Sequence, residues 1–324
     1  MKALVAIYSP FASWCIPEAQ VKWLRDEFPG HTFTRADTDA ETLERIVDAD
    51  VVFGATVRPD QLAAARRLRW IHSPAAGIGN MLFPEMIASP VLMSNSRGNS
   101  AATIAEHVVG VTIALLRDFP LAFRRQVERV WAQDEFDAGA RVQMLRDSRV
   151  LVVGFGSIGR EVGRLMSALG AQVVGIRRSK PSTPAGAVTT FQHLHEELPL
   201  ADVVIISAPQ TKETAHMMND AAFGAMKEGA VIVNVSRGKL IDEAALVRAL
   251  ERGRLRGAAL DVFEHEPLAP DSPLWTRKNV LITPHVSGFQ ARHWADAAAL
   301  FAENLRRFES GRPLLNPVDK AAGY

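Results

Sequence analysis

A glycine-rich turn is the first feature of this sequence whose residue types and spacing point to a definite chemistry. It runs Gly154-Phe155-Gly156-Ser157-Ile158-Gly159, directly after an apolar run at residues 150–153. Glycines at this spacing allow a tight turn, a close approach of the backbone to a pyrophosphate, and close packing of a helix on a strand. The following stretch favours a helix, whose first N–H groups would bind the phosphates. We therefore expect a dinucleotide site, and a turn that only connects two elements is the alternative.

The residues after the next apolar run bear on which dinucleotide binds. An NAD enzyme usually carries an acidic residue at this place, which binds the ribose hydroxyls. This sequence has Arg177-Arg178-Ser179 instead. Two guanidinium groups and a hydroxyl suit the 2′-phosphate of NADP, because arginine binds phosphate through paired, charge-assisted hydrogen bonds. The sequence predicts NADP as the preferred cofactor with NAD possible, and a solvated basic loop that accepts either cofactor is the alternative.

The elements that must position these residues alternate along the chain, strand after helix, as is typical of an α/β protein with parallel sheets. An early series has strands at residues 4–7, 51–54 and 70–72, with helices near residues 17–28 and 59–67. A second series has strands at residues 150–153, 172–175, 203–207, 230–235, 257–260 and 280–283. Ligands of such sheets bind at the carboxyl ends of the strands.

Two segments separate the series. Ile104, Val108, Val111 and Leu115 recur at helical spacing, so we expect a helix over residues 100–116 with Ser100 as its cap. Residues 124–147 are polar and poorly periodic, so we expect them to lie over a surface or a subunit interface.

Composition excludes several classes of protein. The 324 residues are 48% hydrophobic, enough for about two domains. A net charge of +1 gives no electrostatic reason to expect a nucleic acid or an anionic membrane as partner. No apolar run reaches the roughly 20 residues of a membrane helix, and the apolar start favours a strand over a signal peptide. The single cysteine, Cys15, fits a reducing compartment, so we expect a cytoplasmic protein.

Several ordered motifs carry a family resemblance that covers most of the chain. They are Ala105-Glu106-His107, the glycine-rich turn, Pro209 with Thr211 and Thr214, Asn234-Val235-Ser236-Arg237-Gly238, residues 259–267, Thr283-Pro284-His285-Val286-Ser287-Gly288, and Asn316-Pro317-Val318-Asp319. Together they resemble the D-isomer-specific 2-hydroxyacid dehydrogenases, the family that includes glyoxylate/hydroxypyruvate reductases. The resemblance implies hydride transfer between NAD(P)H and a small 2-keto or 2-hydroxy acid.

The resemblance implies a catalytic set of Arg237, Glu266 and His285. A guanidinium can hold the carboxylate of a keto acid and polarise its carbonyl. An imidazolium can give the carbonyl oxygen the proton it needs as hydride arrives, and a carboxylate beside the histidine favours that charged form. Each residue also has a structural alternative. Arg237 could form a surface ion pair, Glu266 could cap a turn, and His285 could be a structural histidine whose hydrogen bonds are satisfied.

Further site residues follow from the same resemblance. Asp261 is expected to contact the nicotinamide carboxamide or to shape its pocket, while Glu264 and His265 are expected to be solvated. Beyond the residues of the glycine-rich turn and Arg177-Arg178-Ser179, the expected cofactor contacts are Thr103, Ala208, Pro209, Thr214, Val235, Ser236, Arg237, Asp261, His285, Ser287 and Gly288.

The loop Pro74-Ala75-Ala76-Gly77-Ile78-Gly79-Asn80 resembles the family's substrate loop. Successive amides form a nest for anions, so Ala76, Gly77 and Ile78 are expected to bind the substrate with Arg237 and His285. A purely structural turn is the alternative. His293 and Trp294 are expected near the substrate, from this chain or a neighbouring subunit.

Two features are set aside. Residues 193–197 have metal-like types, but no matching ligands occur elsewhere, so no metal is expected. Cys15 lacks an activating base and is not expected to act as a nucleophile.

The expected architecture is two Rossmann-like, doubly wound parallel-sheet domains with a cleft between them. Residues 1–97 and 288–324 would form the substrate domain and residues 98–287 the dinucleotide-binding domain. The resemblance also implies a homodimer. Other functions stay open: a phosphite-oxidising dehydrogenase, a dinucleotide-sensing module of the corepressor type, and a structural protein with an inactive site.

Overall fold

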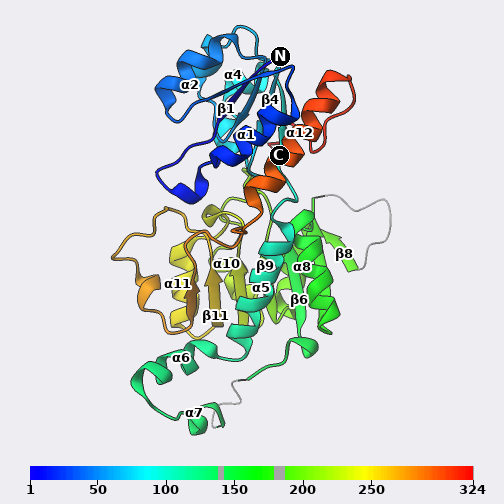
Figure 1. Ribbon diagram of the computed structural model, residues 1–324. Coiled ribbons are helices and arrows are strands. Elements are labelled where there is room, and N and C mark those ends of the chain that lie inside the picture. The colour runs from blue at the N-terminus through cyan, green and yellow to red at the C-terminus, as the bar shows by residue number, and fades with distance from the viewer. Residues whose placement is uncertain (138–141, 179–186, 324) are drawn as a thin grey trace. The chain divides into compact units, whose positions relative to one another are not determined.

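The protein folds into two compact units in the computed structural model, which describes residues 1–137, 142–178 and 187–323 (Figure 1). Unit 1 comprises Met1–Asn99 and Gln290–Tyr324, and unit 2 comprises Ser100–Phe289. The chain passes from unit 1 to unit 2 after residue 99 and returns to unit 1 after residue 289. Each of these boundaries lies two residues later than the one expected from the sequence. The assignment of unit 1 to the substrate and of unit 2 to the cofactor stays a prediction.

Unit 1 is built on a five-stranded sheet in the order β2-β1-β3-β4-β5, in which every pair of neighbours is parallel. Its strands are β1 (Lys2–Ala6), β2 (Thr32–Arg35), β3 (Val51–Gly54), β4 (Trp70–Ser73) and β5 (Leu92–Asn95). Its helices are α1 (Glu18–Glu27), α2 (Asp39–Arg45), α3 (Pro59–Ala64), α4 (Pro84–Ala88) and α12 (His293–Glu309).

Both faces of this sheet are covered, which explains why β1 is apolar without alternation. Val5 packs on one face in a cluster with Phe301, and Leu4 packs on the other face in a cluster with Met81. The ring of Phe301 in α12 stacks on Phe53 at 4.6 Å. The last helix of the chain therefore completes the core of the unit that contains the N-terminus.

Unit 2 contains a seven-stranded sheet in the order β12-β11-β10-β9-β6-β7-β8, again parallel throughout. Its strands are β6 (Arg149–Val153), β7 (Gln172–Arg177), β8 (Ala187–Thr190), β9 (Val203–Ile206), β10 (Ala230–Asn234), β11 (Leu255–Leu260) and β12 (Val280–Ile282). Its helices are α5 (Ala101–Leu116), α6 (Phe119–Glu128), α7 (Gln133–Asp137), α8 (Ser157–Ala168), α9 (Leu194–Glu197), α10 (Asp220–Ala225) and α11 (Glu243–Glu251).

The strands of unit 2 divide their side chains between two apolar layers. Val150 and Val152 face the cluster that contains Val108 of α5, whereas Leu151 faces the cluster that contains Leu246 of α11. Helices thus cover both faces of the sheet. The structure confirms the expected fold class of two parallel, doubly wound α/β sheets.

Some local features differ from the sequence-based expectations. The described part of residues 124–147, expected to lie over a surface or a subunit interface, contains the end of α6 and all of α7, which stand off the sheet of unit 2 in Figure 1. Ser100 is the residue before α5, but its side chain makes no capping hydrogen bond. The strands β2, β5 and β8 were not anticipated, because polar residues make up half or more of each and leave no apolar run.

Among the described residues, no helix is both long enough and apolar enough to cross a membrane.

Candidate active site

The strands of unit 2 end in register, which brings loops far apart in sequence to one edge. Val153 of β6 pairs with Ile176 on one side and Ile206 on the other. The alignment continues through Asn234 and Leu260 to Ile282. The residues that follow these six strands therefore emerge together at the carboxyl edge, where parallel sheets bind their ligands.

The glycine-rich turn lies at the switch point of this sheet, since β6 has β7 on one side and β9 on the other. Gly154 has a φ of 100°, and a Cβ there would lie 2.3 Å from the backbone N of Ala208. A Cβ at Gly159 would lie 2.2 Å from the carbonyl oxygen of Gly154. Gly154 therefore needs glycine for its contact with the loop after β9, and Gly159 needs glycine for its contact within the turn.

Gly156 differs, because open space surrounds the direction of its missing Cβ. It precedes Ser157 and Ile158 at the start of α8, where no side chain of the described residues caps the helix. An uncapped helix start beside open space fits a pyrophosphate, which accepts hydrogen bonds from such N–H groups.

Hydroxyl groups join the neighbouring loops at this edge. Ser207 Oγ donates to the carbonyl oxygen of Gly154 at 2.8 Å, and Ser236 Oγ donates to that of Ala208. Thr214 Oγ1 donates to the carbonyl oxygen of Pro209 at 2.8 Å. These side chains hold the loops that would surround a bound dinucleotide.

The arginines expected at the 2′-phosphate end lie at the end of β7. Arg177 is the last residue of the strand and is partly exposed, and Arg178 follows it and is exposed. A hydrogen bond with Thr211 lowers the pKa of Glu213, and the charge of Arg178 adds to that effect. Ser179 lies outside the described residues.

The remaining expected cofactor residues lie along the same edge. Thr103 is in the first turn of α5, and a Cβ at Gly288 would lie 3.5 Å from Ser100 just before that helix. Val235 follows β10 and is buried. This proximity places the loop after His285 beside the start of α5.

His285 and Glu266 form a hydrogen-bonded pair, with 2.7 Å between Nδ1 and Oε2. The other carboxylate oxygen of Glu266 accepts the backbone N–H of Phe263 at 3.0 Å. Partial burial acts to raise the pKa of Glu266, but these hydrogen bonds and the charges of His285 and Arg237 outweigh it and lower the pKa. Glu266 is therefore ionised near neutral pH.

Arg237 stands in the loop after β10. Asn234 binds both ends of this loop, since its Nδ2 donates to the carbonyl oxygen of Arg237 at 3.0 Å and its Oδ1 accepts the N–H of Ser236 at 3.1 Å. A Cβ at Gly238 would lie 1.8 Å from the carbonyl carbon of Phe263, so only glycine lets this loop meet the loop of Glu266. Desolvation lowers the pKa of Arg237, and Glu266 opposes the shift. The guanidinium stays charged because its ordinary pKa is so high.

Asp261 holds the turn that presents His285. The carboxylate is buried and accepts the hydroxyl of Thr283 at 2.6 Å and the N–H groups of Val286 and Ser287 at 2.9 and 3.0 Å. His285 itself has a φ of 55°, an unusual value for a residue with a side chain. Asp261 thus fixes the turn that carries His285, through hydrogen bonds from three groups of this chain.

Three residues outside the expected site contribute to this geometry. His107, expected to pack or hydrogen-bond between the domains, has its Nε2 3.4 Å from the hydroxyl of Thr283 in the same unit, and so extends the Asp261 network into α5. Asn234 belongs to a motif, but its hydrogen bonds were not predicted. Glu264, expected to be solvated, accepts the backbone N–H of Glu243 at 3.0 Å. The available signals were a polar last residue in the buried strand β10 for Asn234 and a polar residue directly after β12 for Thr283.

The substrate loop lies in unit 1, after β4. The carbonyl oxygen of Ala76 accepts a hydrogen bond from Asn95 Nδ2 at 2.7 Å, and Ile78 is buried. Ala76 and Gly77 are exposed. Within the residues that the structure describes, neither of their N–H groups has a hydrogen-bond acceptor. The hydrogen bond from Asn95 and the buried side chain of Ile78 thus hold the loop in place, while Ala76 and Gly77 are exposed to solvent.

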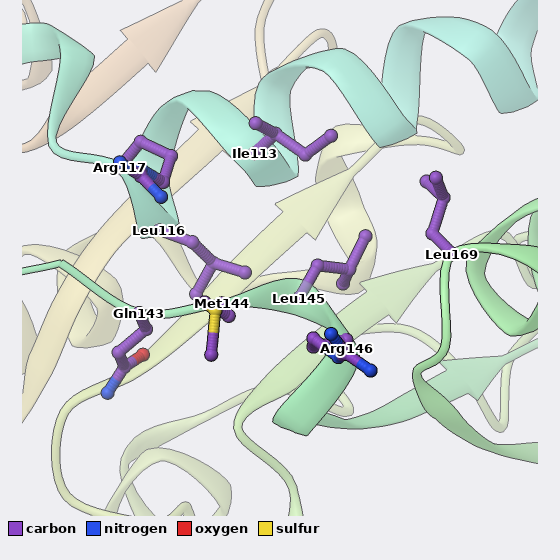
Figure 2. Close-up of a pocket in the computed structure, with 8 residues that line it drawn as sticks. All are labelled: Ile113, Leu116, Arg117, Gln143, Met144, Leu145, Arg146 and Leu169. Carbon is purple, nitrogen blue, oxygen red and sulfur yellow. The ribbon is translucent and has the colours of Figure 1, made fainter.

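Two other features lie apart from the strand-end site. In the described part of the chain, no group of three or more potential ligands could hold a metal ion. A pocket of about 250 Å³ is lined by Ile113 and Leu116 of α5, Leu145 and Leu169, among others, and Figure 2 shows these side chains. It adjoins the residues that precede β6, at the amino end of a strand, whereas Gly154 follows the carboxyl end.

Comparisons with known proteins identify the family to which this chain is similar. The family model described as D-isomer specific 2-hydroxyacid dehydrogenase, NAD binding domain, matches residues 109–287. A putative 2-hydroxyacid dehydrogenase from Haemophilus influenzae is 36% identical over 282 residues, which cover 83% of this chain and 86% of the relative. A D-3-phosphoglycerate dehydrogenase from Archaeoglobus fulgidus is 30% identical over 81% of this chain, which spans only 49% of that protein's length.

A solved structure extends the likeness to both units. An NADPH-dependent glyoxylate/hydroxypyruvate reductase from Sinorhizobium meliloti, in complex with NADP and sulfate, matches with a TM-score of 0.84 at 26% identity. The match covers 100% of each chain.

Proposed function

Because this chain belongs to the D-isomer-specific 2-hydroxyacid dehydrogenase family, whose members use a nicotinamide cofactor, we propose that it interconverts a small 2-keto acid and its 2-hydroxy acid with NADPH as the preferred reductant. The observation that carries this proposal is the hydrogen bond between His285 and Glu266 on a strand-end edge that also presents Arg237 and the glycine-rich turn.

Each residue of the catalytic set has a separate task. Arg237 binds the carboxylate of the keto acid and polarises its carbonyl oxygen. NADPH, when bound, supplies a hydride to the carbonyl carbon. His285 gives its proton to the carbonyl oxygen, and we assign that proton to Nε2 because Glu266 binds Nδ1. Glu266 keeps the imidazole charged and oriented. The product is the 2-hydroxy acid, and the reverse reaction uses neutral His285 as the base.

The chain's own residues fit the dinucleotide. We propose that Gly154, Gly156, Ser157, Ile158 and Gly159 receive the pyrophosphate at the start of α8. Arg177, Arg178 and Ser179 would bind the 2′-phosphate. The nicotinamide half would lie among Thr103, Ala208, Pro209, Thr214, Val235, Ser236, Arg237, Asp261, His285, Ser287 and Gly288. The substrate carboxylate would also bind the amides of Ala76, Gly77 and Ile78.

The proposed reaction is tested by following NADPH oxidation with glyoxylate, hydroxypyruvate, pyruvate and phenylpyruvate. Turnover of at least one of these acids, with the matching 2-hydroxy acid as product, is the expected result. Tight binding of NADPH without turnover of any of them would contradict the proposal and favour a dinucleotide-sensing module.

The cofactor preference is tested separately. A charged hydrogen bond contributes about 1.5 to 3 kcal/mol, and the exposure of Arg178 and its proximity to Glu213 favour the lower figure. We expect kcat/KM for NADPH to exceed that for NADH by at least about tenfold, and Arg177→Asp to reverse much of this preference. Equal kcat/KM values at low ionic strength would show that the arginines do not select the cofactor.

We also propose that the protein is a homodimer. α6 and the described residues after it carry large exposed apolar side chains, among them Val127 at 85% exposure and Trp131 at 90%. Several exposed apolar side chains in one segment favour an interface with another molecule, and a second copy of the chain is the simplest partner.

A further inference from the structure

A second cavity lies in unit 1, at the carboxyl ends of its strands. It has a volume of about 280 Å³ and is lined by residues that follow β1, β3 and β4, with others from the start of α12. The sheet order changes direction at β1, which has β2 on one side and β3 on the other. The cavity therefore occupies the switch point of this sheet, the place where open α/β sheets bind ligands.

Aromatic rings form much of the cavity wall. The rings of Trp14 and His293 meet edge to face at 6.3 Å, and those of His293 and Trp294 do so at 4.8 Å. Trp294 Nε1 donates to the carbonyl oxygen of Ser13 at 3.3 Å, and the Tyr8 hydroxyl donates to Asp39 Oδ1 at 2.7 Å. Because these polar atoms already have partners, the two rings offer the cavity mainly carbon surface.

The cavity wall carries no charge at neutral pH. Among the described residues that line it there is no lysine, arginine, aspartate or glutamate; the polar ones besides Tyr8 and the indoles are Ser9, Thr56, Asn80 and His293. Burial lowers the pKa of His293, although Asp296 acts to raise it. A ligand group with a phosphate or a carboxylate would find no counter-ion here, and burying such a charge unpaired is costly.

The cavity is continuous with the substrate loop. Pro74, Ala75 and Asn80 line it, and they flank Ala76 and Gly77, whose exposed amides are assigned to the substrate carboxylate. A ligand held by those amides can therefore extend its other end into the cavity. The volume lies near the lower limit of small-molecule pockets, so the cavity suits one ring-sized group.

We propose that this cavity binds the side chain of the substrate, and that the preferred substrates are 2-keto acids with an aromatic, uncharged side chain. The inference rests on the proposed function and adds the substrate class. Glyoxylate has no side chain to fill the cavity, and a phosphorylated keto acid would place a charge against an uncharged wall. Aromatic rings favour the edge-to-face contacts that Trp14, His293 and Trp294 can offer.

The first test compares kcat/KM for phenylpyruvate, pyruvate, glyoxylate and 3-phosphohydroxypyruvate at saturating NADPH. We expect phenylpyruvate to exceed glyoxylate by at least about tenfold, since a filled apolar pocket discriminates by roughly 10- to 200-fold for each methylene group. Glyoxylate or 3-phosphohydroxypyruvate equal to or better than phenylpyruvate would overturn the assignment and leave the proposed reaction intact.

The second test changes the cavity itself. Ala55→Leu fills it from the loop after β3, and Trp14→Ala removes one aromatic wall. Each variant should lower the ratio of kcat/KM for phenylpyruvate to that for pyruvate by about tenfold, which corresponds to about 1.4 kcal/mol. The matched control is Ala63→Leu on the exposed side of α3, outside the cavity lining, which should leave the ratio unchanged. An unchanged ratio in both cavity variants would overturn the assignment.

Equilibrium binding separates this inference from the proposed reaction. If none of the keto acids is turned over, the proposed function fails, and the cavity is judged by titrating D-3-phenyllactate against tryptophan fluorescence. Saturable quenching in the wild type that is lost in Ala55→Leu supports the cavity assignment, because Trp14 and Trp294 line the site. Absence of quenching in the wild type overturns it.

Discussion

Both carboxylate oxygens of Glu266 are engaged, one by His285 and the other by the N–H of Phe263. The charge of His285 helps to lower the pKa of Glu266, and by the same interaction the carboxylate stabilises the imidazolium. Glu266→Gln removes the negative charge and keeps the side-chain shape.

We therefore expect Glu266→Gln to move the alkaline limb of the kcat/KM profile for keto-acid reduction to lower pH, because the imidazolium loses its neighbouring negative charge. The measurement is a pH profile from pH 5.5 to 9.5 with the best keto acid. An alkaline limb that stays in place would remove Glu266 from its assigned role.

Arg237 offers a planar pair of donors, which a lysine cannot reproduce. Arg237→Lys keeps the charge near Glu266 but loses bidentate binding of a carboxylate. We expect kcat/KM for the keto acid to fall by at least about 100-fold, a loss of about 2.7 kcal/mol, with little change in the Kd of NADPH. If the Kd of NADPH rises by the same factor and kcat at saturation is unchanged, Arg237 belongs to the cofactor site instead.

At the scale of elements, a chain of hydrogen bonds buried in unit 1 fixes the end of β4. Trp70 Nε1 donates to Ser94 Oγ at 2.9 Å, and Ser94 Oγ lies 2.7 Å from His72 Nδ1. His72 Nε2 lies 3.2 Å from Ser96 Oγ, which donates to the carbonyl oxygen of Ser73. Because the hydroxyl proton of Ser96 is donated to the carbonyl oxygen of Ser73, Nε2 of His72 must donate to Ser96 Oγ. Nδ1 of His72 must then accept the hydroxyl proton of Ser94. This network supports the strand that leads into the substrate loop.

A protonated His72 carries a hydrogen on both ring nitrogens, so Nδ1 can no longer accept the hydrogen bond from Ser94. Burial lowers the pKa of His72 to about 3, while the unfolded chain should titrate near 6.5. The stability that neutral His72 contributes is complete above about pH 6.5 and is lost as the pH falls toward 3. Between pH 7 and pH 4 the free energy of unfolding therefore falls by roughly 3 kcal/mol through His72 alone.

Urea unfolding at pH 7 and pH 4 measures this effect. His72→Phe should show a smaller loss of stability over that interval than the wild type, by roughly 3 kcal/mol. The exposed His195, replaced in His195→Gln, is the control and should behave as the wild type. Equal losses in wild type and His72→Phe would show that His72 titrates normally.

Long periodic elements such as α5 and α8, and apolar runs such as β6 and β9, were predicted from the sequence because their patterns are local. The types of the candidate catalytic residues were also predicted, through motifs. Their contacts were not: Glu266 and His285 are 19 residues apart, and only the register of β11 with β12 aligns the loops that carry them. The network from Asp261 through Thr283 to His107 likewise depends on strand ends meeting a helix.

At the scale of the whole molecule, large apolar side chains in and after α6 are exposed in the part of the chain that the structure describes. Phe123 is 57% exposed, and Val127 and Trp131 are more exposed still. We expect the wild type to be a dimer at micromolar concentration by sedimentation equilibrium. A double variant with Val127→Asp and Trp131→Asp should be a monomer, because each aspartate would place an unpaired charge in an apolar interface.

Leu200→Asp is the control for this prediction, since Leu200 is 52% exposed and lies away from α6 in the sequence. It should leave the dimer intact. A monomeric wild type, or a double variant that stays dimeric, would exclude this surface as the dimer interface.

The central claim is that His285 donates the proton to the carbonyl oxygen. The kcat of His285→Ala with the best keto acid and NADPH tests this claim most directly. A general acid contributes about 100- to 10,000-fold to the rate, so we predict a loss of kcat in that range. The Kd of NADPH, measured by fluorescence titration of the same variant, should stay within about threefold of the wild type, because the glycine-rich turn and the arginines after β7 would carry most of the binding. A His285→Ala protein with near wild-type kcat would contradict the account.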